Sequence, residues 1–437
     1  MSSTAAAAPA SVLLRLRSRV ARLSTRQRRE ARLFVAAVLL IAGHVIDDSF
    51  IQPQPGTSPS DHLVSGLVPL AFLLGAAWGY PRLRGGRRAA LALTLGVLGL
   101  AAGGEAWQYT NTVGASGDDY SGLLAILAGV VLLAIGVVTL WRTRRLDGSR
   151  PRRYVRRSLL GAAGVLVFVY VVVPVGMSYV DTHVARAAVP AADLGVAHQD
   201  VSFETSDGLT LHGWYVPSRN GAAVIAFPGR KGPQAHARML ARHGYGVLLF
   251  DRRGEGESDG DPTSWGWGNE RDLKAAIGFL RHRADVDPDR IGGLGLSVGG
   301  EMMIQTAAET TALKAVASEG AGMRSVRETL DSPASSDKWV ATPFKVVETA
   351  AVAVFHDQLP PASLVDLVTK VRPRPLLLMY SGTGQGGEVE LNPEFYRAAG
   401  DPKTLWKIPG SSHAGGIRAQ PREYERRVIK FFDNALL

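Results

Sequence analysis

The residues around Ser297 have the composition of a strained turn that exposes a serine hydroxyl. An apolar run of strand character leads into Gly295-Leu296-Ser297-Val298-Gly299, and apolar residues at helical spacing follow it. Small residues two positions before and after the serine let the strand and helix backbones approach closely. A hydroxyl at a helix N-terminus lies where developing negative charge is stabilised. The pattern therefore predicts a serine nucleophile that attacks a carbonyl carbon.

A serine nucleophile needs an adjacent general base, and His413 is the histidine best placed to provide it. It follows the strand-like run 404–408 and Pro409-Gly410, and a helical pattern carrying Tyr424, Val428 and Phe432 comes after it. We predict that His413 accepts the hydroxyl proton of Ser297.

These motifs resemble the α/β-hydrolase superfamily over about residues 200–437. Residues 295–299 resemble its nucleophile elbow, 251–260 resemble its D-x-R-G-x-G-x-S-x-G loop, and 409–413 resemble its P-G-x-x-H ending. The resemblance implies a serine hydrolase whose triad follows the chain order serine, acid, histidine. It implies no metal and no organic cofactor.

The acid of that triad departs from the superfamily pattern. Where relatives carry an aspartate after a late strand, this chain carries Gln385, and glutamine cannot stabilise an imidazolium as a carboxylate does. Glu388 stands three residues further along a glycine-rich loop that can bring its longer side chain back. We predict Glu388 as the acid, with Glu390 as second choice and Glu319, just past the strand pattern 313–318, as third.

The resemblance also implies the donors of an oxyanion hole. Pro228-Gly229 stands where many relatives have His-Gly, so the backbone amide of Arg230 would supply one donor and that of Val298 the other. Asp251 and Arg253, in the glycine-containing loop, are expected to be structural.

These residues predict cleavage of an ester, thioester or amide through an acyl-enzyme, with a small-molecule or lipid-like acyl substrate. Two alternatives to this hydrolase stay open. The first is a binding or sensory module that has lost its acid, and the second is an acyltransferase acting on an envelope component. The sequence does not identify the substrate or the oligomeric state.

The order of predicted elements indicates an α/β domain over residues 199–437. Strand patterns alternate with helical ones, which is typical of a mostly parallel sheet. A hairpin is expected around Asp207-Gly208, and a small cap insertion at about 322–371, where four prolines interrupt the pattern.

The chain has 437 residues, a formal net charge of +10 and no cysteine, which excludes disulfides, thiolate metal sites and cysteine nucleophiles. Residues 1–180 contain 20 arginines, no lysine and 8 acidic residues, so they hold all of the excess positive charge. This location favours membrane topology over nucleic-acid binding.

We expect a basic N-terminal segment over 1–30, an all-α membrane domain of about five helices over 31–180 and a connector over 181–198. The bilayer is therefore an expected partner. Each predicted span approaches the roughly 20 apolar residues that cross a bilayer. The spans are 33–46, extended towards Ile51, then 63–80, 89–107, 122–141 and 158–179.

Loop charges alternate along this region. Residues 47–61 and 108–121 carry no Lys or Arg, whereas 81–88 carry four arginines and 142–157 carry eight. The positive-inside rule then predicts a cytoplasmic N-terminus and an extracytoplasmic hydrolase domain. His44 and Asp48, one helical turn apart on the first span, could form a metal or proton site. We expect them instead to pack the outer end of the bundle.

Overall fold

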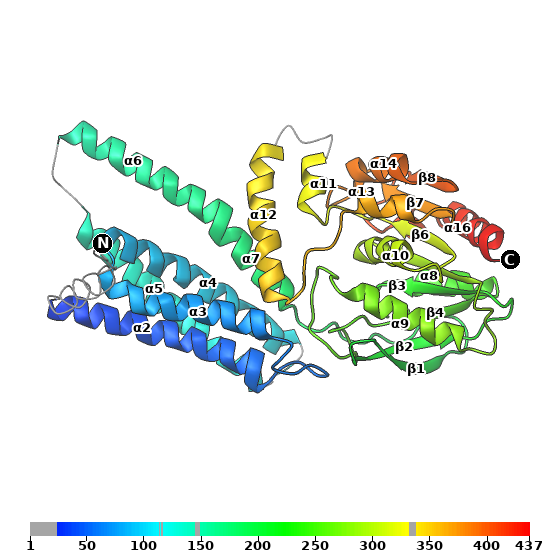
Figure 1. Cartoon of the computed structure of the whole chain (residues 1–437), viewed down its shortest axis with the longest axis horizontal. Helices are drawn as coiled ribbons and strands as arrows, with labels where there is room; N and C mark the ends of the chain where they lie inside the picture. Colours follow the sequence, from blue (N-terminus) through cyan, green and yellow to red (C-terminus); the bar gives the residue numbers. More distant parts are fainter. Residues whose placement is uncertain (1–23, 113, 115–116, 145–148, 332–337) are drawn as a thin grey trace, which may run out of the picture. The chain divides into compact units, whose positions relative to one another are not determined.

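The computed structural model describes residues 24–112, 114, 117–144, 149–331 and 338–437. The chain divides into two compact units (Figure 1). Unit 1 comprises Met1–Pro53 and Pro59–Val180, and unit 2 comprises Gln54–Ser58 and Asp181–Leu437. Most of the basic segment expected over 1–30 lies outside the described residues. The sequence did not predict that 54–58, between the first two apolar helices, belong with unit 2.

Unit 1 contains five helices that are long and apolar enough to cross a membrane. The first continues as a π-helix to Ile51, which is the extension that the sequence required. The last begins at Arg150, inside an arginine-rich stretch that we predicted to be a loop. The helices are α2 (Thr25–Ile46) with η1 (Asp47–Ile51), α3 (Leu63–Gly79) with η2 (Tyr80–Arg82), α4 (Gly85–Thr112), α5 (Gly117–Thr143), and α6 (Arg150–Val167) with η3 (Phe168–Val172) and α7 (Val173–Thr182).

Small residues allow α4 and α5 to pack with their backbones in close contact. A Cβ added to Gly129 would lie 2.9 Å from the carbonyl oxygen of Gly96, and one added to Gly103 would lie 2.7 Å from the amide nitrogen of Ile126. Close approach of this kind stabilises helix pairs in lipid, where van der Waals packing replaces the hydrophobic effect.

His44 is buried in unit 1, where it joins three helices. Its Nδ1 lies 3.1 Å from Oγ of Ser121 on α5, and its Nε2 lies 3.2 Å from the hydroxyl of Tyr179 on α7. Both ring nitrogens therefore have hydrogen-bonding partners. Among the described residues, no group of three His, Asp or Glu side chains could hold a metal ion.

Unit 2 is built on an eight-stranded sheet with the order β1-β2-β4-β3-β5-β6-β7-β8. The pairs β1–β2 and β2–β4 are antiparallel and all other pairs are parallel, so the sheet is mostly parallel, as predicted. The hairpin turns at Asp207-Gly208, where Gly208 has a φ of +85°. The strands are β1 (Gln199–Glu204), β2 (Thr210–Val216), β3 (Ala223–Phe227), β4 (Gly246–Phe250), β5 (Ile291–Leu296), β6 (Ala315–Glu319), β7 (Leu376–Ser381) and β8 (Lys403–Ile408).

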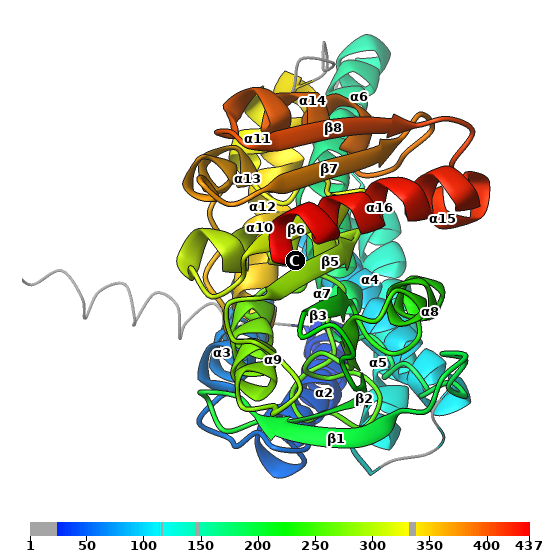
Figure 2. The same cartoon turned by 90° about the vertical axis from the view of Figure 1, so that its right-hand side faces the viewer.

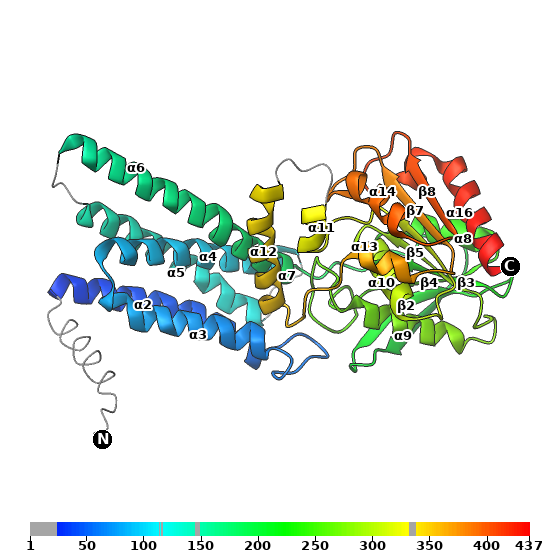
Figure 3. The same cartoon turned by 45° about the horizontal axis from the view of Figure 1, so that its top comes forward.

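Helices cover both faces of the sheet (Figures 2 and 3). On one face, α8 (Gln234–Arg242) and α16 (Pro421–Leu436) pack through residues such as Leu240 and Phe432. On the other, α9 (Asn269–Arg281), α10 (Val298–Glu309), α13 (Leu364–Leu367) and α14 (Glu388–Ala398) contribute Leu273, Met303 and Phe395. The short α15 (Gly416–Ala419) precedes α16. Both faces of the central strands are therefore buried, which explains their continuous apolar character.

The insertion between β6 and β7 contains α11 (Val326–Asp331), α12 (Lys338–Phe355), α13 and η4 (Val368–Lys370). Glu328, fully buried on α11, ties its parts together. One of its carboxylate oxygens accepts hydrogen bonds from the amides of Arg324 and Ser325, and the other from Leu364 at the start of α13. The segment predicted as a cap is thus a helical insertion held by a buried carboxylate.

Candidate active site

Ser297 lies at a sharp turn between β5 and α10, with a φ of 53° and a ψ of −125°. Such a conformation is strained for a residue with a side chain and is typical of functional turns. The flanking glycines make the turn possible. A Cβ at Gly295 would lie 2.3 Å from the carbonyl oxygen of Gly299, and one at Gly299 would lie 2.6 Å from that of Phe227. Ser297 is therefore held at the carboxyl edge of the sheet by backbone contacts on both sides.

His413 follows β8 and reaches the same edge. Its Nε2 lies 2.8 Å from Oγ of Ser297. The end of β6 packs against its ring, since a Cβ at Gly320 would lie 3.2 Å from Cε1 of His413. The imidazole is thus in hydrogen-bonding contact with the serine that the sequence singled out.

Glu388 is the carboxylate that contacts this histidine. Its Oε2 is hydrogen-bonded to Nδ1 of His413, and its Oε1 accepts from both the amide and the hydroxyl of Ser381 at the end of β7. The side chain is completely buried, and a Cβ at Gly384 would lie 2.0 Å from Oε1. Glu388 is the first residue of α14 rather than part of the loop. The glycines before it leave room for its carboxylate.

The electrostatics of this pair follow from its geometry. The hydrogen bond that His413 donates to Glu388 raises the pKa of His413 above its ordinary value, against an opposing effect of burial, and the charges of Glu388, Glu319 and Glu301 add to the increase. Burial opposes ionisation of Glu388, but hydrogen bonds from His413 and Ser381 outweigh it and lower the pKa of that carboxyl. A carboxylate beside a histidine that can become imidazolium suits proton transfer at Nε2.

The two other predicted acids have different positions. Glu390 is partly exposed, two residues further along α14, and no contact with His413 is found for it in the described part of the chain. Glu319 is 1% exposed at the end of β6, where Oε1 accepts from the amide of Gly416 and Oε2 from the hydroxyl of Tyr424, both at 2.7 Å. Glu319 therefore holds the segment just after His413 and the start of α16.

The two amides predicted to bind the oxyanion also have different hydrogen-bonding surroundings. Val298 is the first residue of α10, where an amide has no intrahelical acceptor and can point towards a bound oxyanion. The amide of Arg230 instead donates to Oδ1 of Asp251 at 2.8 Å, and its Nε donates to Oδ2 at 2.8 Å. Our prediction for the Arg230 amide therefore does not fit this structure, because the buried Asp251 already engages that donor. Asp251 has the structural position that we expected.

Arg253 is also structural. The residue is buried, and its guanidinium forms ion pairs of 2.7 Å with Asp272 and 2.9 Å with Asp207. These contacts join the loop after β4 to α9 and to the hairpin turn. The charges of Arg252, which pairs with Glu255, and of Arg253 are thus bound within the fold.

Sequence reasoning missed two residues near the serine. Ser381 donates twice to Glu388, and its position as the last residue of β7 was the available signal. Glu301 lies one turn after Ser297 on α10, and its Oε1 accepts from the amide of Gly322 at 3.2 Å. Burial raises the pKa of Glu301 to about 7. The signal for Glu301 in the sequence was a charged residue directly after Gly299-Gly300.

Comparison with known proteins places unit 2 among hydrolases. Residues 185–348 match the family described as X-Pro dipeptidyl-peptidase (S15 family). This segment contains Ser297 and ends before Glu388 and His413.

Several relatives match over about half of this chain. The uncharacterized protein YfhR of Salmonella typhi is 29% identical over 259 residues, which span 54% of this chain and 82% of YfhR. The uncharacterized protein MT2364 of Mycobacterium tuberculosis (strain CDC 1551 / Oshkosh) is 30% identical over 231 residues, spanning 50% of this chain and 73% of that protein.

The polyketide transferase grgF of Penicillium sp is 36% identical over 122 residues, which span 25% of this chain and 40% of grgF. The crystal structure of the α/β hydrolase GrgF superposes with a TM-score of 0.46 and 21% identity, covering 55% of this chain and 99% of GrgF. From the eight-stranded sheet, the serine turn and the similarity to MT2364 and the S15 profile, this chain belongs to the α/β-hydrolase superfamily and is a serine hydrolase of that type.

Proposed function

We propose that this protein is a membrane-anchored hydrolase in which Ser297, His413 and Glu388 act as nucleophile, general base and orienting acid. The observation that carries the proposal is the continuous hydrogen-bonded chain from Oγ of Ser297 through the imidazole of His413 to the buried carboxylate of Glu388. A hydroxyl is a weak nucleophile until such a base accepts its proton.

The chemistry follows from these contacts. With a proton on Nδ1 held by Glu388, Nε2 of His413 accepts the proton of Ser297 as Oγ forms a bond to the substrate carbonyl carbon. The imidazolium then gives that proton to the leaving group, and the carbonyl–leaving-group bond breaks. Water attacks the acyl-enzyme with His413 again as base, which releases the acid and regenerates the serine.

The amide of Val298 stabilises the oxyanion in both steps, aided by the N-terminus of α10. The position of Arg230 offers no second donor while its amide is bound to Asp251. The substrate carries an ester, thioester or amide. The match to the S15 peptidase profile supports the inclusion of amides.

Membrane anchoring is supported by the five apolar helices of unit 1 and by the arginine-rich ends of these helices. The same charge distribution supports a cytoplasmic N-terminus with the hydrolase unit outside the cytoplasm.

Transfer of the acyl group to an acceptor other than water is the second candidate, and the similarity to a polyketide transferase favours it. The contact of Glu388 with His413 supports catalysis over the non-catalytic binding module that Gln385 had left open.

A fluorophosphonate probe tests the nucleophile directly, because it phosphonylates an activated serine without any knowledge of the substrate. We expect the purified full chain in detergent to be labelled, and the variants Ser297→Ala and His413→Ala to remain unlabelled. The variant Ser412→Ala is a matched control beside His413 and should label normally. Absence of labelling in a folded wild-type protein would contradict the proposal. Products analysed with and without added alcohol acceptors separate hydrolysis from transfer.

A further inference from the structure

The cap helix α12 exposes an apolar side, although it also buries a charged residue. Its buried residues are Glu348, Ala351 and Val352, and Glu348 forms an ion pair of 2.8 Å with Lys345. Its exposed residues are apolar. Trp339, Val340 and Val346 are 74%, 61% and 48% exposed.

We call this exposed side the outer face of α12. Its members recur at the spacing of one helical stripe and include no charged residue. They are Trp339, Val340, Pro343, Val346 and Ala350. Leu359, just beyond the helix, is 88% exposed. A stripe of this kind on a water-soluble surface marks a site of contact with a partner or a membrane.

The inner face of α12 is fastened close to the nucleophile. Nζ of Lys345 lies 4.6 Å above the ring of Trp265, and Nε2 of His356 lies 3.1 Å from the carbonyl oxygen of Trp267. Between these two tryptophans, a Cβ at Gly266 would lie 2.6 Å from Cγ2 of Val298, the residue after Ser297. One layer of protein therefore separates α12 from the serine turn.

The connections along the chain indicate what covers the outer face of α12. Unit 2 is joined through Asp181 to the last of five helices that can cross a membrane, and residues 54–58 of unit 2 join the first two of them. Within unit 2, Gly260 donates to the carbonyl oxygen of Pro55 at 2.8 Å and Arg186 donates to the side chain of Gln54. A unit tethered through several such connections stays beside the bilayer if unit 1 spans it.

We infer that the outer face of α12 lies in the interfacial region of the same bilayer, so that Ser297 receives acyl groups from lipid-embedded substrates. Tryptophan and aliphatic side chains without charges prefer that region. The cap is then the part of the hydrolase that contacts the membrane, and its inner face leads to the serine turn. This inference rests on the proposed membrane anchoring and narrows the proposed substrate to acyl chains carried by the bilayer.

The absence of cysteine makes the test clean, because a single introduced cysteine is the only thiol. We would attach a nitroxide to Val346→Cys in the full chain, reconstituted in vesicles of phosphatidylcholine and phosphatidylglycerol. Collision rates with oxygen, which concentrates in lipid, and with a nickel chelate, which stays in water, report the environment of the label.

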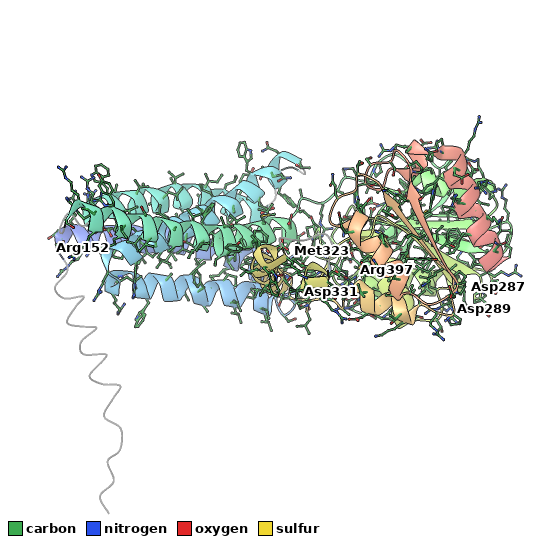
Figure 4. All side chains as sticks on the ribbon, turned by 90° about the horizontal axis from the view of Figure 1, so that it is seen from above. Arg152, Asp287, Asp289, Met323, Asp331 and Arg397 are labelled. Atoms are coloured by element: carbon green, nitrogen blue, oxygen red, sulfur yellow. The ribbon has the colours of Figure 1, made fainter. Side chains whose placement is uncertain are left out.

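Two control positions calibrate the measurement. Leu127, on α5, is 58% exposed, so a label at Leu127→Cys should report the oxygen-rich environment of the bilayer. The side chain of Asp289, in unit 2, is 82% exposed, so a label at Asp289→Cys should report an aqueous environment. Asp289 is at the end of unit 2 remote from Asp331, which ends the helix before α12 (Figure 4).

The inference predicts that the label at 346 collides with oxygen more than with the nickel chelate, as at 127. Nickel accessibility equal to that at 289 would overturn it, and so would shielding from both reagents, which indicates a protein partner or a second copy. A water-like reading at 127 would instead remove the membrane anchoring, and the inference with it, while leaving fluorophosphonate labelling of Ser297 intact.

A second experiment measures how fast Ser297 reacts with probes presented from the membrane or from water. In Trp339→Glu/Val346→Glu, labelling by a long-chain fluorophosphonate dissolved in vesicles should slow by roughly tenfold, because charge on this face opposes insertion. Labelling by a short, water-soluble fluorophosphonate should be unchanged, and Trp339→Phe/Val346→Leu should behave as wild type. Equal rates for the long-chain probe in wild type and in the glutamate variant would contradict the inference.

Discussion

The Nε2 atom of His413 lies 2.8 Å from Oγ of Ser297, although 116 positions separate the two residues in the chain. The serine is fixed by β5 and α10, whereas the histidine is fixed by β8 and by the contact of Glu319 with Gly416. Two parallel strands that end at one sheet edge therefore bring a hydroxyl and a base together. The geometry leads to five predictions.

Glu388→Gln should lower kcat/KM roughly 1,000- to 10,000-fold, because an amide cannot hold the tautomer of His413 or stabilise its imidazolium. Glu390→Gln is the matched control, two residues away on α14, and should stay close to wild type. Hydrolysis of a soluble activated ester measures both. A larger loss in the Glu390 variant would assign the acid to that position.

The pH profile should follow the raised pKa of His413. The base must be neutral, so kcat/KM should fall as the pH drops through a pKa above the ordinary histidine value of 6.5. Because Glu388 raises this pKa, Glu388→Gln should move the acidic limb to lower pH while reducing the maximal rate. An acidic limb that stays in place in this variant would contradict the coupling.

Glu319→Gln should shift the same limb to lower pH by a smaller amount, since the charge of Glu319 also raises the pKa of His413. It should also cost about 2 kcal/mol of unfolding free energy, because two buried donors lose a charged acceptor. Tyr424→Phe removes one of those hydrogen bonds but keeps the charge, so it should lower stability without moving the limb. Identical pH profiles for Glu319→Gln and wild type would make Glu319 purely structural.

Gly299→Ala should destabilise unit 2 by about 3 kcal/mol or more, because its Cβ would lie 2.6 Å from the carbonyl oxygen of Phe227. Gly278→Ala is the control on α9, where a Cβ meets nothing within 4 Å, and it should stabilise by about 0.5 to 1 kcal/mol. Thermal unfolding of the two variants measures the difference. Similar unfolding temperatures would show that the turn can relax.

His44→Ala should lower the stability of unit 1 by about 1 kcal/mol, because the hydrogen bonds to Ser121 and Tyr179 are lost. The rate of fluorophosphonate labelling should not change. Thr112→Val is the control, since its hydroxyl donates to the carbonyl oxygen of Gln108 within its own helix. Loss of labelling in a folded His44 variant would give the polar residues of the bundle a role in the chemistry.

The sequence alone determined those features that depend on local pattern. Glycines on both sides of Ser297 specified the turn, alternating apolar segments specified a mostly parallel sheet, and five long apolar runs specified the helices of unit 1. Each of these follows from side-chain size or hydrophobic periodicity over a few residues, which a sequence displays directly.

Only the tertiary structure decided which groups meet. Three glutamates were candidates for the acid, and the structure brings Glu388, buried against Ser381, into contact with His413 instead of Glu390 on the same helix. We predicted the Arg230 amide as a donor for the substrate, but it binds Asp251, from the loop after β4. Such outcomes depend on contacts between distant segments of the chain, because the direction of a side chain or amide is set by packing that no local pattern records.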